Sequence, residues 1–264
     1  MNARVGRILT QWRRAPELLA STRETTEALT LVLGYLGLRS PSYPLVVRFR
    51  TGQQLRVETH HDLVTLWIIF FRNEYALPEG CRTIVDAGAN IGAFSLYAAR
   101  RSPRATIHAL EPFPSTRERL TQTLEQNQLT SRVKVYELAL ADVASGGSSR
   151  HMADDGPSQS RGTRSEPVPG SVAVQVSTLE QFLDDANIGE ADFLKMDIEG
   201  AEHEVIHAAA PAVIRRFRQI ALEYHPNGPA DALFHKLISC GFVCQHDARV
   251  GQDSGVAHFA RTAS

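Results

Sequence analysis

Five acidic residues of this chain each follow a short apolar run that is typical of a buried strand. They are Asp86, Glu111, Asp142, Asp197 and Glu223. In an open α/β sheet, ligands bind outside the carboxyl ends of the strands, so we expect these side chains to converge on one edge. One such acid alone is more often a helix cap or a dipole partner, and the prediction of a binding site therefore depends on the convergence.

The first of these acids begins the stretch Asp86-Ala-Gly-Ala-Asn-Ile-Gly92, between a predicted strand and a predicted helix over residues 93–100. Gly88 lets the backbone turn tightly, and Gly92 lets a ligand approach the start of the helix without meeting a side chain. This order of strand, glycine turn and helix indicates a nucleotide-binding site. Glu111 ends the next predicted strand, where an acid is suited to hold ribose hydroxyls.

The charge of this turn separates two kinds of cofactor. A dinucleotide needs a glycine-lined helix start for its pyrophosphate, usually Gly-x-Gly-x-x-Gly. This turn instead has Asn90 between Gly88 and Gly92, and it carries Asp86. A ligand without phosphate, but with a cationic sulfonium and an ammonium group, suits the acidic edge better. S-adenosylmethionine is such a ligand, and a nicotinamide-dependent oxidoreductase is the alternative.

Methyl transfer is an in-line displacement, so most of its acceleration can come from aligning the acceptor oxygen, the methyl group and the sulfur. A general base adds about 10²–10⁴-fold. His225 is our first candidate for the base and Asp197 the second, although a turn histidine that only packs explains His225 equally well. With Glu223, these two residues could instead hold a divalent cation, and oxygen-rich ligands favour magnesium. Of Glu199 and Glu202, we expect one to cap a helix and one to contact the acceptor.

Further along the chain, strands and helices alternate, which predicts a parallel sheet with right-handed crossovers. The expected strands are 105–110, 133–140, 172–176, 191–197 and 219–223. The expected helices are 115–126, 178–186, 199–210 and 230–239. Two short apolar runs near the end of the chain, residues 242–244 and 256–260, are typical of a closing antiparallel hairpin. Ser115 and Glu118 resemble a capping box at the start of their helix.

We predict a main α/β domain over residues 81–264, preceded by a helical cap and hairpin extension over residues 1–80. In the extension, alternation about Thr51-Gly52 predicts the hairpin, and the apolar run 63–71 predicts a buried helix. Residues 145–171 are dominated by Gly, Ser, Pro, Arg and Asp. Such a segment predicts a flexible insertion, either a lid over the site or a passive loop.

Tyr75 precedes the main sheet and is a candidate cofactor contact at the mouth of the site. A packing residue with a solvated hydroxyl is the alternative. We expect the N-terminal helices to cap the main domain. A homo-oligomer surface is the alternative, as is a non-catalytic scaffold protein whose helices recruit a partner.

The composition argues against several classes of protein. A formal net charge of -1 gives no field that favours nucleic acid or an anionic membrane. The three cysteines have no paired zinc spacing, which fits a reducing cytoplasm. No signal-peptide core follows the N-terminal arginines, and the most apolar run is well short of the roughly 20 residues that cross a bilayer. We therefore expect a cytoplasmic protein with a small-molecule partner, and neither nucleic acid nor membrane binding.

Several motifs together resemble the FkbM-type family of S-adenosylmethionine-dependent methyltransferases. They are Asp86-Ala-Gly-Ala-Asn-Ile-Gly92, Glu111-Pro112, Ala139-Leu140-Ala141-Asp142, Lys195-Met-Asp-Ile-Glu-Gly-Ala-Glu202 and Glu223-Tyr-His225. The resemblance extends over roughly residues 45–260. It implies a Rossmann-like class I methyltransferase fold with a sheet of seven mostly parallel strands. In that fold the last hairpin supplies the antiparallel strand.

The resemblance also assigns roles to individual residues. Those that would line the methionine part of the cofactor are Asp86, Gly88, Asn90 and Gly92. Glu111 would bind the ribose, and Asp142 would lie near the adenine amino group. Members of the family commonly methylate hydroxyl groups on natural products or glycans, so we expect O-methylation of such a small molecule. N-methylation stays open because the donor site would be the same.

Overall fold

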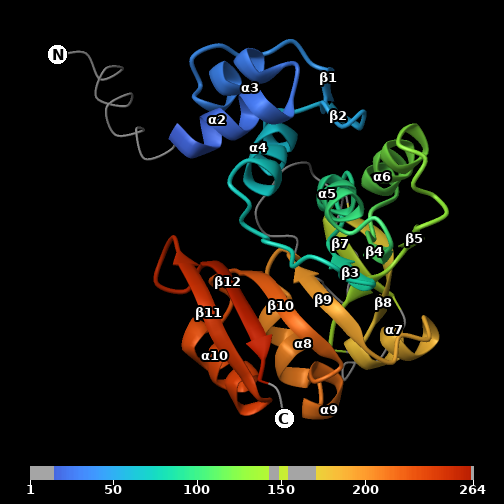
Figure 1. Cartoon of the computed structure of the whole chain (residues 1–264). Coiled ribbons are helices and arrows are strands. Elements are labelled where there is room, and N and C mark those ends of the chain that lie inside the picture. Colours follow the sequence, from blue (N-terminus) through green and yellow to red (C-terminus); the bar gives the residue numbers. More distant parts are fainter. Residues whose placement is uncertain (1–14, 143–148, 154–170, 263–264) are drawn as a thin grey trace. The chain divides into compact units, whose positions relative to one another are not determined.

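The computed structural model describes residues 15–142, 149–153 and 171–262 of the 264-residue chain. By internal contacts the chain divides into two compact units, Met1–Glu74 and Tyr75–Ser264 (Figure 1). The organisation expected from the sequence, residues 1–80 and 81–264, stays a prediction. We describe each unit by itself.

The first unit contains a helical part and a two-stranded hairpin. Its elements are α2 (Ala15–Glu24), α3 (Ala28–Tyr35), β1 (Leu45–Arg48), β2 (Gln54–Val57) and α4 (His60–Phe70). The strands pair antiparallel, which confirms the predicted hairpin. The predicted buried helix is also confirmed, because the fully buried Trp67 of α4 stacks on Tyr35 with ring centroids 4.2 Å apart. The Trp67 indole donates a hydrogen bond of 2.7 Å to Glu17, so its polar atom is satisfied.

Helix α4 begins with a capping box that the sequence analysis missed. The Thr59 side chain accepts a hydrogen bond from the Asp62 amide, and the Asp62 carboxylate accepts one from the Thr59 amide. The capping box expected at Ser115 and Glu118 was wrong. Helix α6 (Pro114–Gln126) already begins at Pro114, and its N-cap, Phe113, makes no side-chain cap bond. Ser115 is therefore inside the first turn, where a capping hydroxyl has no role.

The second unit is built on a seven-stranded sheet in the order β11-β12-β10-β9-β3-β4-β5. Its strands are β3 (Thr83–Ala87), β4 (Thr106–Leu110), β5 (Val133–Tyr136), β9 (Ala191–Met196), β10 (Phe217–Tyr224), β11 (Phe242–Arg249) and β12 (Gly255–Arg261). Its other helices are α5 (Ala93–Arg101), α7 (Leu179–Asp185), α8 (Glu202–Ala208), α9 (Pro211–Ile214) and α10 (Ala230–Ser239). Neighbouring strands from β10 to β5 pair in parallel, and β12 is antiparallel to both of its neighbours. This arrangement confirms the mostly parallel sheet and the antiparallel strand from the last hairpin.

The strand expected over residues 133–140 is two strands that belong to different sheets. After β5, the chain enters β6 (Ala139–Leu140), which pairs in parallel with β8 (Ser171–Ser177). Strand β7 (Ser149–Ala153) pairs antiparallel with β8 and completes a small sheet in the order β6-β8-β7. Strand β7 lies within residues 145–171, and the flexible insertion predicted there stays a prediction. Residues 143–148 and 154–170 lie outside the described part of the chain.

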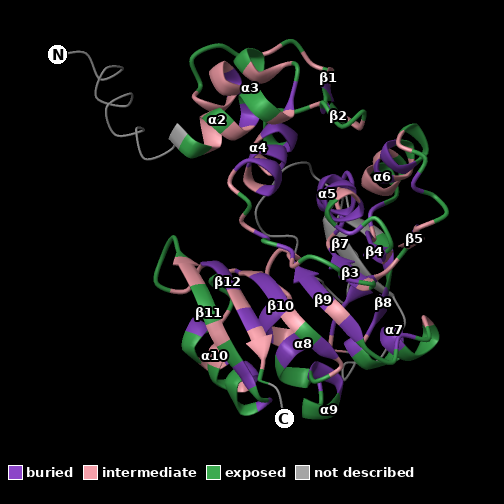
Figure 2. Ribbon diagram, viewed as in Figure 1, coloured by how far each residue is buried: buried purple, intermediate pink, exposed green. Residues whose placement is uncertain are grey.

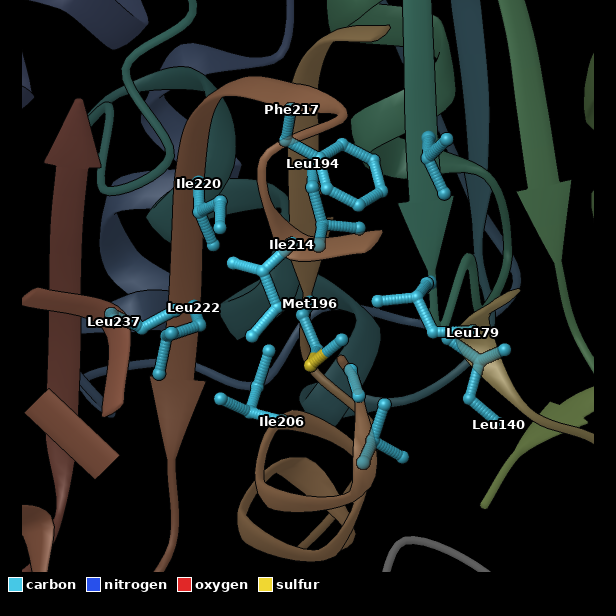
Figure 3. Close-up of a cluster of buried hydrophobic side chains, with 14 of the residues drawn as sticks. Leu140, Leu179, Leu194, Met196, Ile206, Ile214, Phe217, Ile220, Leu222 and Leu237 are labelled. Carbon is cyan, nitrogen blue, oxygen red and sulfur yellow. The ribbon is translucent and has the colours of Figure 1, made fainter. Parts of the chain in front are cut away.

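The two faces of the central strands differ sharply in polarity. Side chains alternate along a strand, and Leu194 and Met196 of β9 point into a large apolar cluster with Ile206 of α8 and Leu222 of β10 (Figure 3). Lys195 lies between them in sequence and therefore on the opposite face. Figure 2 shows that β3 and β9 are buried over most of their length, whereas the edge strand β11 is largely exposed. The lysine is consequently buried in the centre of the sheet.

We predict that Thr59→Ala lowers the free energy of unfolding by about 1 kcal/mol, because the Asp62 amide loses its side-chain acceptor. Ser115→Ala is the matched control and should change it by less than about 0.5 kcal/mol. Urea unfolding followed by circular dichroism measures both values. Equal losses in the two variants would contradict the assignment of the cap.

Candidate functional site

A pocket opens at the carboxyl ends of β3, β4 and β9, within the second unit. Its empty volume is about 660 Å³, open solvent included. It is lined by Ala87, Gly88, Asn90, Leu110, Glu111, Pro112, Phe113, Leu138, Ala139, Leu140, Asp197, Ile198, Glu199 and Ala201. Of the five strand-end acids, Glu111 and Asp197 line this pocket. The convergence expected from the sequence is therefore partial.

The glycine turn after β3 lies against the backbone that follows β9. Gly88 has a φ of +76°, and a Cβ atom at this position would lie 1.8 Å from the carbonyl oxygen of Asp197. Gly88 is thus required both by its left-handed conformation and by the close approach of the two chains. Gly92 does not line the pocket. A Cβ atom there would lie 2.7 Å from Leu120, so this glycine permits contact between α5 and α6.

Glu111 presents a fixed carboxylate to the pocket. One oxygen accepts a 2.9 Å hydrogen bond from the Asn90 amide, and the other accepts a 3.1 Å bond from the Phe113 amide. The residue is 4% exposed. The two backbone amides therefore set the orientation of the Glu111 carboxylate at the pocket.

Asp86 lies beneath the turn and is completely buried. Its Oδ2 accepts a 2.7 Å hydrogen bond from the Ser95 hydroxyl, and its Oδ1 lies 3.5 Å from the Lys195 ammonium. Burial raises the pKa of Asp86, and the charge of Lys195 opposes this rise. Asp86 is placed to support the turn from below and is not among the residues that line the pocket.

Tyr75, Asp197 and Glu223 form one cluster beside the pocket. The Tyr75 hydroxyl lies 2.8 Å from Glu223 Oε2 and 3.2 Å from Asp197 Oδ2, within hydrogen-bond distance of both. Burial, followed by the charge of Asp197, raises the pKa of Glu223 to about 7. Tyr75 and Glu223 do not line the pocket. They are connected to it by the contact of Tyr75 with Asp197, which does line it.

His225 lies between two carboxylates. Its Nδ1 is 3.3 Å from Glu202 Oε1, and its Nε2 is 3.9 Å from Glu199 Oε2. Burial opposes the charged imidazolium, but the Glu202 carboxylate, with those of Glu223 and Asp197, outweighs burial and raises the pKa of His225 to about 9. At neutral pH the ring is therefore protonated, and it can act as a proton acceptor only after it has lost this proton at alkaline pH.

Glu199 and Glu202 have different positions. The helix expected from 199 begins only at Glu202, because Glu199 and Gly200 have φ values of +58° and +105°. The buried Glu202 carboxylate accepts hydrogen bonds from the amides of Ile198 and Gly200, so it holds this loop. Glu199 lines the pocket. The strained loop therefore places the Glu199 carboxylate in the site.

The apolar wall of the pocket was not predicted from the sequence. Leu138 and the two residues of β6 line it, and Phe113 packs in a cluster with Val174 and Val176 of β8. Pro112 and Phe113 directly follow Glu111, and Ile198 directly follows Asp197, so taking the residues after each strand-end acid would have found part of this wall. Asp142 is not in it, and its amide donates to Glu204 instead.

The expectation of a divalent cation on Asp197, Glu223 and His225 has no support. Among the residues described, no group of three or more His, Cys, Asp or Glu side chains could hold a metal ion. Tyr75 instead contacts both Asp197 and Glu223, and His225 is paired with Glu202.

The pocket fits S-adenosylmethionine by charge and shape. Its described lining contains three carboxylates and no Lys, Arg or His, which suits a cationic ligand without phosphate. Glu111 is oriented by two amides, and the apolar wall with Phe113 offers a surface for a flat base. The sheet order and the position of this site are those of the Rossmann-like class I methyltransferase fold.

Comparison with known proteins gives the family. Residues 86–244 match the Methyltransferase FkbM domain, so the chain belongs to the FkbM methyltransferase family. The relatives include the methyltransferase SdnD of Sordaria araneosa, which is 32% identical over 62% of this chain and 74% of its own length. The hexuronic acid methyltransferase AglP of Haloferax volcanii is 27% identical over 48% of this chain and 50% of its own. The 31-O-demethyl-FK506 methyltransferase FkbM of Streptomyces tacrolimicus is 24% identical over 54% and 65%.

The coverage of the relatives varies widely. The chain spans half of AglP and about two thirds of FkbM, and it spans only 10% of the length of one further, much longer relative. Within the described ranges, no helix is both long and apolar enough to span a membrane.

We predict that Gly88→Ala costs roughly 3 kcal/mol or more of stability, because left-handed strain adds to a backbone overlap with Asp197. Gly80→Ala is the matched control, since Gly80 has a φ of +79° and nothing within 4 Å of the added Cβ. It should cost about 1–2 kcal/mol. Urea unfolding of both variants gives the difference, and equal costs would show that the close approach is unimportant.

We predict that the His225 ring titrates near pH 9 in an NMR titration, above the ordinary value of about 6.5. Because the folded pKa is raised, the stabilisation is fully present below about pH 6.5 and is lost as the pH rises through about 9. Glu202→Gln should lower the midpoint, because burial alone lowers the pKa. A midpoint at or below 6.5 in the unmodified protein would contradict the pairing with Glu202.

Proposed function

We propose that this protein transfers the methyl group of S-adenosylmethionine to a hydroxyl group on a small natural product or a glycan. The observation that carries the proposal is the placement of Glu111 and Asp197 on one pocket. Glu111 is oriented by two backbone amides, and Asp197 lies beside Lys195 and Tyr75. The Glu111 carboxylate suits the methyl donor, and the Asp197 carboxylate suits the acceptor.

For the donor, we assign the ribose hydroxyls to Glu111 and the methionine part to the turn that contains Gly88 and Asn90. The bound cofactor supplies a methyl group activated by a positively charged sulfur. The apolar wall over 138–140, together with Phe113, would receive the adenine ring. Asp86 and Gly92 support the donor site from below, because one is buried under the turn and the other is packed against Leu120.

For the acceptor, we assign proton removal to Asp197, which faces the pocket. As the carbon–oxygen bond forms and the carbon–sulfur bond breaks, the hydroxyl proton passes to the Asp197 carboxylate. Glu223 acts through Tyr75 to orient this carboxylate. His225, protonated at neutral pH, holds the loop that carries Glu199 and is not the base there.

The substrate class draws on the family. The names of AglP and FkbM refer to a hexuronic acid and to 31-O-demethyl-FK506. Both are hydroxyl-rich small molecules, which favours O-methylation over N-methylation. We further propose that the N-terminal helices form a homo-oligomer surface and that the protein is cytoplasmic. We also propose that it binds neither nucleic acid nor membranes.

We predict that S-adenosylmethionine and S-adenosylhomocysteine raise the melting temperature, and that Asp197→Asn lowers kcat by about 10²–10⁴-fold while S-adenosylhomocysteine binding persists. Asp231→Asn is the control, because Asp231 lies on α10 with 84% of its side chain exposed, and its activity should match the unmodified protein. Scanning fluorimetry and a panel of sugars and polyketides serve as assays.

No melting shift with either ligand would overturn the proposed cofactor, and a shift with NAD instead would favour an oxidoreductase. Cofactor binding without turnover on the panel, and without any effect of Asp197→Asn, would favour a non-catalytic scaffold.

A further inference from the structure

Lys195 is a lysine buried in the middle of the sheet, with 3% of its surface exposed. It lies on β9 directly opposite Asp86 of β3 in the parallel ladder. Removing an ammonium group from water is strongly unfavourable unless its partners compensate. The contacts of the ammonium group therefore explain why this position holds a lysine.

The ammonium group connects two separate parts of the pocket. It donates hydrogen bonds to the carbonyl oxygens of Gly88 (2.7 Å) and Ala87 (3.3 Å), which belong to the glycine turn. It also lies 3.6 Å from Asp197 Oδ2, 3.5 Å from Asp86 Oδ1 and 5.6 Å from the centre of the Tyr75 ring. Three of these neighbours, Ala87, Gly88 and Asp197, line the pocket, whereas Lys195 does not.

We infer that Lys195 is a positioning residue, whose ammonium group fixes the donor-binding turn and the acceptor-facing carboxylate of Asp197 in one geometry. This inference rests on the proposed function, because it assigns Gly88 to the donor side and Asp197 to the acceptor side.

The inference has a direct physical basis. Without the ammonium group, two carbonyl oxygens of the turn lose their donor, and the carboxylates of Asp86 and Asp197 face each other without a positive charge between them. Asp197 would then move away from Asp86 and out of line with the acceptor. A displacement of about 1 Å in such an arrangement can reduce the rate by about 10²-fold.

A competing explanation is that Lys195 only compensates the buried charge of Asp86. The two explanations differ in a double variant. Asp86→Asn with Lys195→Met removes both charges, keeps the approximate volumes and leaves no unpaired ion in the sheet. If compensation is the whole role, this variant retains the function.

The experiment measures S-adenosylhomocysteine affinity by calorimetry and kcat at saturating S-adenosylmethionine. For the double variant we expect about tenfold weaker affinity and about 10²-fold lower kcat, with the cooperative melting transition retained. Lys134→Met is the matched control, because Lys134 is exposed on β5, and both quantities should stay within about twofold of the unmodified protein. Wild-type values in the double variant would overturn the inference.

A second measurement uses the unmodified protein, so it does not depend on whether a variant folds. The chain has three lysines, Lys134, Lys195 and Lys236, so the ammonium groups of lysine-labelled protein can be resolved by NMR. Saturating S-adenosylhomocysteine should shift the Lys195 signal and leave the other two in place. An unmoved Lys195 signal in protein that binds the ligand would overturn the inference, while protein that fails to bind the ligand at all would overturn the proposed function instead.

Discussion

The site depends on one close approach between two backbones, at the ends of β3 and β9. The turn after β3 passes so near the carbonyl of Asp197 that a single added carbon at Gly88 would overlap it. The two strands are neighbours in parallel register, so this contact is built into the sheet. With the two strand ends held together, the turn and the acid that follows β9 lie within reach of the same buried ammonium group.

The polarity of the central strands also follows from their register. One face supplies the apolar cluster shown in Figure 3, and the other carries Asp86 and Lys195 under α5. Helix α5 contacts this face, because the Ser95 hydroxyl donates to Asp86 and the Phe94 ring stacks on Phe193 with ring centroids 6.0 Å apart. Buried charges stabilise a fold poorly, and their concentration at the pocket is better explained by positioning than by stability.

Much of this architecture could be predicted from the sequence, because it depends on local signals. The glycine turn, the parallel alternation, the hairpin at residues 51–52 and the closing hairpin all follow from residue types at short spacing. The roles of Lys195 and His225 could not be predicted this way, since they depend on partners across the sheet. The break after Tyr136 was missed for a similar reason: both halves of 133–140 are apolar enough for one strand, and only their partners β4 and β8 separate them.

The small sheet has a consequence for how members of this family can diversify. Strand β6 leaves the pocket wall and β8 returns beside it, with Leu140 opposite Ser177 in a parallel ladder. Because this pairing is parallel, the chain that leaves Leu140 beside the last residue of β8 enters β8 at its first residue, Ser171. The small sheet is separate from the seven-stranded sheet, so a change in the length of this connection leaves the register of the larger sheet unaltered.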